Sequence, residues 1–77
     1  MKVLIFDLTN REYLAADGRR TASPNNAFDF EFTMSAYYQA QHDLLGEFQV
    51  VFYLPESDFV MNVIRGTGTA HALQTAA

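Results

Sequence analysis

The sequence has no cysteine and no tryptophan, and it contains only 2 prolines and 4 glycines among its 77 residues. Without cysteine the chain has neither a disulfide framework nor a thiolate metal site, so a hydrophobic core must hold the fold, as expected in a reducing compartment. A chain this short buries roughly 60 to 65% of the surface that its unfolded form exposes. We therefore expect one small domain over residues 1–77.

Long apolar stretches are missing as well. The longest uninterrupted one covers residues 50–54, whereas a membrane-spanning helix needs about 20 apolar residues. The apolar stretch near the N-terminus ends at Asp7, well short of the hydrophobic region of a signal peptide. These features predict a cytoplasmic protein without a membrane segment.

Basic residues are scarce, because the chain has 5 Lys and Arg against 9 Asp and Glu, which gives a net charge of -4. This balance argues against direct binding of nucleic acid, which needs a basic surface. The deficit is uneven, since four of the five basic residues lie within the first 20 positions and residues 21–64 contain none. The acidic residues of that stretch are Asp29, Glu31, Asp43, Glu47, Glu56 and Asp58.

Hydrophobic residues, by contrast, make up 49% of the chain, as in folded rather than disordered sequences. Residues 3–8 are mostly branched or aromatic and predict a first strand, and a shorter strand follows around Tyr13 and Leu14. Asp17 and Gly18 predict a turn, with residues 19–22 as the returning arm. The breaker cluster at residues 23–26 then ends the N-terminal part.

Residues 28–43 alternate between apolar side chains at even positions and polar ones at odd positions. This period of two predicts a long strand with one buried face, followed by a turn at residues 43–46 and a return strand at 47–54. The resulting hairpin covers residues 27–54. The core residues predicted from it are Phe28, Phe30, Phe32, Phe48, Val50 and Phe52.

A helix at residues 35–45 is the alternative interpretation. Ser35 could cap such a helix, its apolar stripe would be Tyr37, Ala40 and Leu44, and Gly46 would end it. The fold is then α+β. The unbroken alternation favours the strand, and with it a mainly β fold with an antiparallel sheet of about five strands.

The C-terminal part starts with the turn cluster at residues 55–58 and a strand at 59–64 that is apolar on both faces. Such a strand is central in a sheet or lies at an interface. A twofold homodimer is therefore expected, because a small chain gains stability by burying further surface. The predicted contacts are Phe59, Val60, Met61 and Ile64, with Tyr37 and Tyr53 beside them. Residues 66–77 are small and polar and predict a flexible tail.

No motif for catalysis, a cofactor or a metal stands out. His42 and Asp43 are neighbours, as are Ser57 and Asp58, and neighbouring side chains on a strand point to opposite faces. His42, Asp43 and Glu47 lack the spacing of a zinc site. The glycines at 66 and 68 lack the third glycine of a dinucleotide fingerprint. The sequence therefore predicts a protein that is not an enzyme and binds neither cofactor nor metal.

The acidic residues suggest a binding surface instead. On the predicted strand, Asp29 and Glu31 share the wet face at a separation of about 7 Å, and Asp43 and Glu47 flank the predicted turn. These four residues are the predicted contacts to a basic surface of a protein partner.

The small size, the lack of cysteine and of catalytic motifs, the aromatic-rich sheet and the one-sided acidic stretch together resemble the profile of small inhibitor proteins that phages encode. Anti-CRISPR proteins are among them. The resemblance implies a non-catalytic inhibitor that occupies the nucleic-acid-binding surface of a partner such as a CRISPR effector subunit. A structural or assembly module that pairs through strand edges is the alternative.

Overall fold

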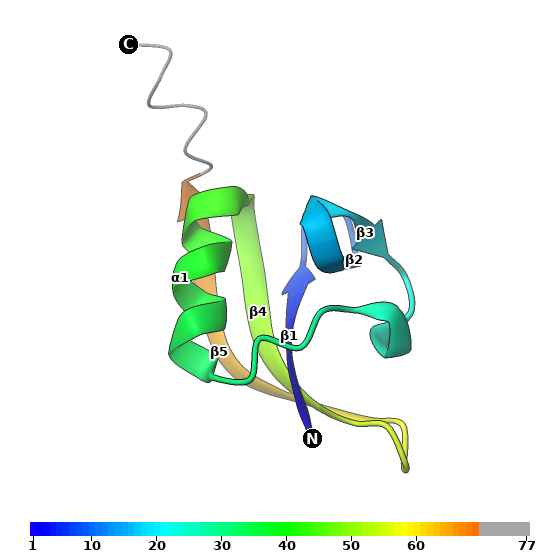
Figure 1. The fold of residues 1–77 in the computed structure, drawn as a ribbon. Helices are drawn as coiled ribbons and strands as arrows, with labels where there is room; N and C mark the ends of the chain where they lie inside the picture. The colour runs from blue at the N-terminus through cyan, green and yellow to red at the C-terminus, as the bar shows by residue number, and fades with distance from the viewer. Residues whose placement is uncertain (70–77) are drawn as a thin grey trace, which may run out of the picture.

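Strands form where branched and aromatic residues cluster, and they build one five-stranded antiparallel sheet in the order β3-β2-β1-β4-β5 (Figure 1). The structure is a computed structural model, and it describes residues 1–69. The strands are β1 (Lys2–Asp7), β2 (Glu12–Leu14), β3 (Arg20–Thr21), β4 (Leu45–Leu54) and β5 (Phe59–Thr69). The helical segments are the α-helix α1 (Thr33–Asp43) and the short 3-10 turns η1 (Ala16–Gly18) and η2 (Pro24–Asn26). The prediction of a mainly β fold with an antiparallel sheet is confirmed.

The helix α1 packs against one face of the sheet (Figure 1). The strand predicted over residues 28–43, and with it the hairpin 27–54, is wrong. The alternative of a helix in this region is confirmed, but the helix covers Thr33–Asp43 and not 35–45, and its N-cap is Phe32 and not Ser35. Ala36, Ala40 and Leu44 are four residues apart, so they fit a period of two and also one face of a helix. All three are buried, whereas Met34 and Tyr38, which a period of two would also bury, are 47% and 61% exposed, so the packing uses the helical spacing.

The tight turn predicted at residues 43–46 is also wrong. Leu44 leaves the helix with an extended backbone, at φ -107° and ψ 152°, and leads directly into β4. Gly46 already belongs to β4 and has φ 98°, and a Cβ atom there would lie 2.6 Å from Oγ1 of Thr9. Glycine is therefore required at this position for its backbone conformation and for the close approach of Thr9.

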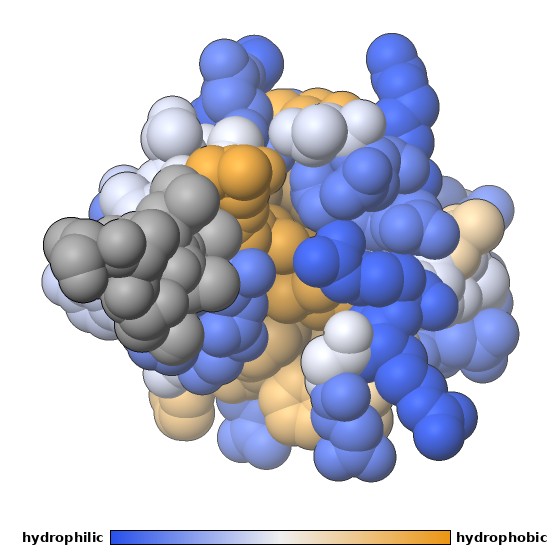
Figure 2. All heavy atoms as spheres, turned by 90° about the horizontal axis from the view of Figure 1, so that it is seen from above, coloured by the Kyte–Doolittle hydropathy of each residue, from blue (hydrophilic) through white to orange (hydrophobic). Residues whose placement is uncertain are grey.

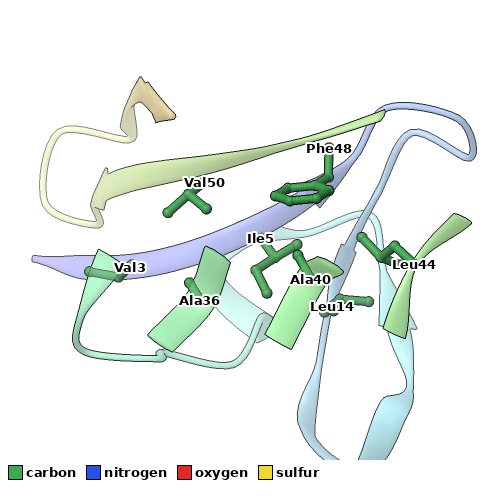
Figure 3. Close-up of a cluster of buried hydrophobic side chains, with 8 residues drawn as sticks. All are labelled: Val3, Ile5, Leu14, Ala36, Ala40, Leu44, Phe48 and Val50. Atoms are coloured by element: carbon green, nitrogen blue, oxygen red, sulfur yellow. The ribbon is translucent and has the colours of Figure 1, made fainter. Parts of the chain in front are cut away.

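The core lies on both faces of the central strands. Figure 3 shows the cluster between α1 and the sheet, in which Ala36 and Ala40 face side chains of β1 and β4. Its buried members are Val3, Ile5, Leu14, Ala36, Ala40, Leu44, Phe48 and Val50. Leu4, Ala27, Val51 and Tyr53 form a second cluster. Successive residues of β4 thus alternate between two apolar environments, which explains why this strand is hydrophobic on both faces.

The predicted core was only partly right. Phe48 and Val50 are fully buried, and Phe30 and Phe52 pack against the same cluster. Phe28 and Phe32, however, are 45% and 68% exposed. The alternating pattern predicts both side chains on the buried face of a strand. They lie instead on the irregular segment before α1, where alternate side chains do not share one face.

The predicted turns and the last strand agree better with the structure. Asp17 and Gly18 turn the chain between β2 and β3 with φ of 62° and 74°, and residues 55–58 form the turn between β4 and β5. The predicted strand at 59–64 is confirmed, but β5 continues to Thr69, so residues 66–69 are not a tail. The rest of the predicted tail, residues 70–77, lies outside the described residues.

Candidate interaction surfaces

Asp29 accepts a backbone hydrogen bond from β1 at a position where β2 does not pair with that strand. On its outer side β1 pairs with β2 at Phe6 and Asp7, and the segment before α1 lies beside the N-terminal half. There Phe30 donates its backbone N–H to the Val3 carbonyl at 2.9 Å, and Val3 donates its N–H to the Asp29 carboxylate at 3.0 Å. The same carboxylate oxygen accepts the backbone N–H of Glu31 at 2.9 Å. The carboxylate of Asp29 therefore has a structural role, because it binds the segment before α1 to β1.

The other acidic residues predicted to bind a partner lie on separate parts of the fold. Glu31 is exposed on the segment before α1 with φ 70°, so it does not share a wet strand face with Asp29. Asp43 ends α1 and accepts a hydrogen bond from Gln39 at 2.6 Å. Glu47 lies on β4 and forms a salt bridge with Arg65 of β5. The acidic stretch of the sequence is thus divided among a loop, a helix end and a strand.

The outer edge of β5 is the clearest unpaired surface. β5 is the last strand of the sheet, so it has a neighbour on one side only. Phe59, Val60, Met61 and Val63 are 51%, 40%, 47% and 37% exposed, and we call these four residues the β5 edge surface. No charged residue occurs between Phe59 and Arg65. An exposed, apolar edge strand is a template for pairing with another strand.

The two tyrosines and the isoleucine predicted at a dimer contact belong to the interior instead. Tyr53 is fully buried and donates its hydroxyl to Asp58 at 3.0 Å, so it cannot touch a second chain. Burial, together with the nearby Asp58 carboxylate, raises the pKa of Tyr53. Tyr37 is half-buried against Phe48, at 5.6 Å between ring centroids, and Ile64 packs against the same cluster.

Asp7 is a buried carboxylate at the end of β1, and it is 2% exposed. It accepts hydrogen bonds from the backbone N–H groups of Thr9 and Asn10, from the Asn10 side chain and from Arg20 at 2.7 Å. Burial alone raises the pKa of Asp7, but these donors outweigh it and hold the pKa below its ordinary value of 3.8. The network joins the end of β1 to β3, and the full set of donors around this buried carboxylate indicates a structural role.

A hollow of about 250 Å³ lies between α1 and the turn that joins β2 to β3. Figure 2 looks down on this end of the molecule and shows hydrophobic atoms between two hydrophilic sides. The side chains that matter for its chemistry are Leu14, Asp17, Phe28, Phe30, Gln39 and Asp43. They come from three segments that only the tertiary fold brings together, so the sequence predicts Asp43 as a partner contact but does not predict that it borders a hollow with Phe28 and Phe30.

Metal chemistry and membrane crossing find no support in residues 1–69. Nowhere in that part of the chain do three His, Asp or Glu side chains gather closely enough to hold a metal ion. None of its helices has the length and apolar character that crossing a bilayer requires. His42 and Asp43 are neighbours on α1, with Nδ1 of His42 2.9 Å from Oδ1 of Asp43.

Comparison with protein-family models, with curated proteins and with solved structures finds no match to this chain.

Proposed function

We propose that the chain is a protein-binding module without catalytic activity, which pairs through the edge of β5 with a strand of another chain. The observation that carries this proposal is the β5 edge surface, an apolar row on the last strand of the sheet. An edge strand offers a row of unpaired backbone N–H and C=O groups, and a second strand can satisfy them by extending the sheet.

A second copy of the chain is the simplest partner. Two β5 strands in antiparallel orientation would make one continuous sheet around a twofold axis. Each copy has a net charge of -4, so contact through a charged surface would meet repulsion. The run from Phe59 to Ile64 is uncharged, and it lets two acidic chains meet without placing like charges against each other.

The test is the oligomeric state in light scattering, with two matched variants. Met61 on β5 and Met34 on α1 are both 47% exposed. We expect a dimer for the wild type and for Met34→Lys, and a monomer for Met61→Lys, because a charge on an edge strand opposes pairing. Circular dichroism checks that both variants fold. A wild type that stays monomeric at high micromolar concentration, or a dimeric Met61→Lys, would contradict the proposal.

A second candidate is the inhibitor suggested by the resemblance to anti-CRISPR proteins, which would cover a basic, nucleic-acid-binding surface of a protein partner. The observation that favours it is the absence of Lys and Arg from residues 21–64, with Glu31 and Glu56 exposed. Asp29 and Glu47 support it less, because both are engaged within the fold.

Salt dependence tests the inhibitor proposal on a purified CRISPR effector complex. We expect inhibition of its nucleic-acid binding at low salt and a marked loss of inhibition at about 0.5 M salt, where screening reaches only a few ångströms. The variant with Glu31→Lys and Glu56→Lys should associate more slowly. If the wild type does not inhibit, or inhibits equally at both salt concentrations, this candidate is wrong.

A further inference from the structure

The hollow between α1 and the β2–β3 turn combines an apolar wall with an acidic rim. Phe28 and Phe30 meet edge to face, with ring centroids 4.8 Å apart and an interplanar angle of 74°. Phe30 packs against the core, whereas Phe28 is 45% exposed, and Leu14 is buried beneath. The face of an aromatic ring attracts cations, so the exposed part of Phe28 suits a cationic ligand.

The polar groups around the hollow are acceptors. Asp17 lies on one side, held by the turn at φ 62°, and Asp43 lies on the other side at the end of α1, where its Oδ1 is 2.9 Å from Nδ1 of His42. Gln39 donates its amide N–H to Asp43, so the amide oxygen of Gln39 is the part of that group that can accept a further bond. No Lys or Arg side chain is among the residues that line the hollow.

We propose that this hollow binds the side chain of one arginine on a partner protein. At about 250 Å³ the hollow is smaller than the roughly 300 to 1,000 Å³ of pockets that enclose a whole small molecule. A guanidinium group stacks on aromatic rings and forms paired hydrogen bonds with carboxylates, and its three-carbon stem packs on apolar surface. Lysine fits less well, because its compact ammonium group is strongly hydrated.

The site is independent of pairing through β5. The hollow involves β2, the turn after it and α1, whereas β5 is at the opposite end of the strand order. A dimer formed through β5 would therefore keep both hollows, one on each chain. The arginine site would supply a specific contact for the inhibitor candidate, but it can be tested without a CRISPR effector complex.

The test is a titration of the full chain with N-acetyl-arginine methylamide, followed by nuclear magnetic resonance of the backbone amides. We expect saturable shifts in the millimolar range, largest at Leu14, Phe28 and Gln39. The citrulline analogue has the same shape without the charge, and it should bind about tenfold more weakly because it loses the ionic hydrogen bonds and the cation–π contact. The lysine analogue should also bind more weakly than arginine.

Two variants at the hollow and one control variant locate the site. Asp17→Asn keeps a residue that tolerates the left-handed backbone, and it should weaken arginine binding several-fold. Glu56→Gln removes the same charge on the distant β4–β5 turn and should leave binding unchanged. Phe28→Leu should weaken arginine binding while keeping an apolar wall. If shifts do not saturate, if citrulline or lysine binds as well as arginine, or if Glu56→Gln acts like Asp17→Asn, the proposal is overturned.

Discussion

Asp7 shows how a single buried side chain links pH to stability. In the folded state the pKa of Asp7 is held below 3.8, because the hydrogen bonds from Asn10, Arg20 and Thr9 outweigh the opposing effect of burial. A group whose pKa is lowered by folding contributes stability above its unfolded pKa, and this contribution is lost as the pH falls through the folded value. Asp7 thus stabilises the fold at neutral pH and ceases to do so in strong acid.

We expect Asp7→Asn to lower the free energy of unfolding at pH 7 by about 1 to 3 kcal/mol, because it weakens bonds to a buried charged group. Below pH 4 the free energy of unfolding should decrease less steeply with falling pH in the variant than in the wild type. Urea unfolding between pH 2 and 7 measures both effects. Glu56→Gln, on an exposed turn, is the control, and equal pH profiles for Asp7→Asn and the wild type would contradict the assignment.

The buried Tyr53 is expected to make the stability of the fold depend on pH in alkaline solution. Burial first, and then the Asp58 carboxylate, raises the pKa of Tyr53 above 10.0, and the same two causes raise that of Tyr13. A raised pKa means that the stability is fully present below pH 10 and decreases as the pH rises further, because the unfolded tyrosine ionises first. Tyr53→Phe should therefore flatten the decrease above pH 10 in a denaturation series. Tyr38→Phe, at an exposed position, should leave it unchanged.

The position of α1 determines which phenylalanines are buried and therefore contribute to stability. Phe48 on β4 is fully buried under the helix, whereas Phe32 precedes the helix and is 68% exposed. We expect Phe48→Ala to cost about 3 to 5 kcal/mol and Phe32→Ala to stay within about 0.5 kcal/mol of the wild type. Thermal unfolding of the two variants makes the comparison, and similar losses for both would favour the strand interpretation over the helix.

The sequence predicts most strands and turns correctly because their signals are local. The branched residues of β1, the Asp17 and Gly18 turn and the turn at 55–58 each depend on neighbouring residues. The sequence favours a strand over the alternative helix at 35–45 because the small alanines at 36 and 40 satisfy both periods, so only packing against the sheet decides between the two. The hollow could not be predicted at all, because Leu14, Phe28 and Gln39 meet only in three dimensions.

For the whole molecule, the uneven charge of the sequence does not become one acidic face. Asp29 accepts backbone hydrogen bonds and Glu47 pairs with Arg65, the one basic residue beyond position 20. Composition counts these carboxylates as unpaired charge, whereas in the fold Asp29 binds backbone N–H groups and Glu47 forms an ion pair on the surface. A surface prediction from net charge therefore needs the hydrogen-bond partners, which sequence does not give.

If two chains pair through β5 as proposed, the thermal stability depends on protein concentration, because unfolding then separates the two chains. We expect a tenfold increase in concentration to raise the Tm by about 3 to 5 °C for a domain of this size. Met61→Lys, as a monomer, should show a Tm that does not change with concentration. Scanning calorimetry at several concentrations measures this, and a constant wild-type Tm would oppose dimerisation.

The two outer strands of the sheet are unequal, since β5 has 11 residues and β3 has 2. A fibre grows only when every subunit presents two adhesive edges. Here each chain has one long edge and one that is too short to hold a partner strand. When two β5 strands meet, both long edges are consumed and the β3 strands form the outer ends. In the proposed dimer the chain would be a monovalent building unit, so assembly would end at two copies and would not continue into a polymer.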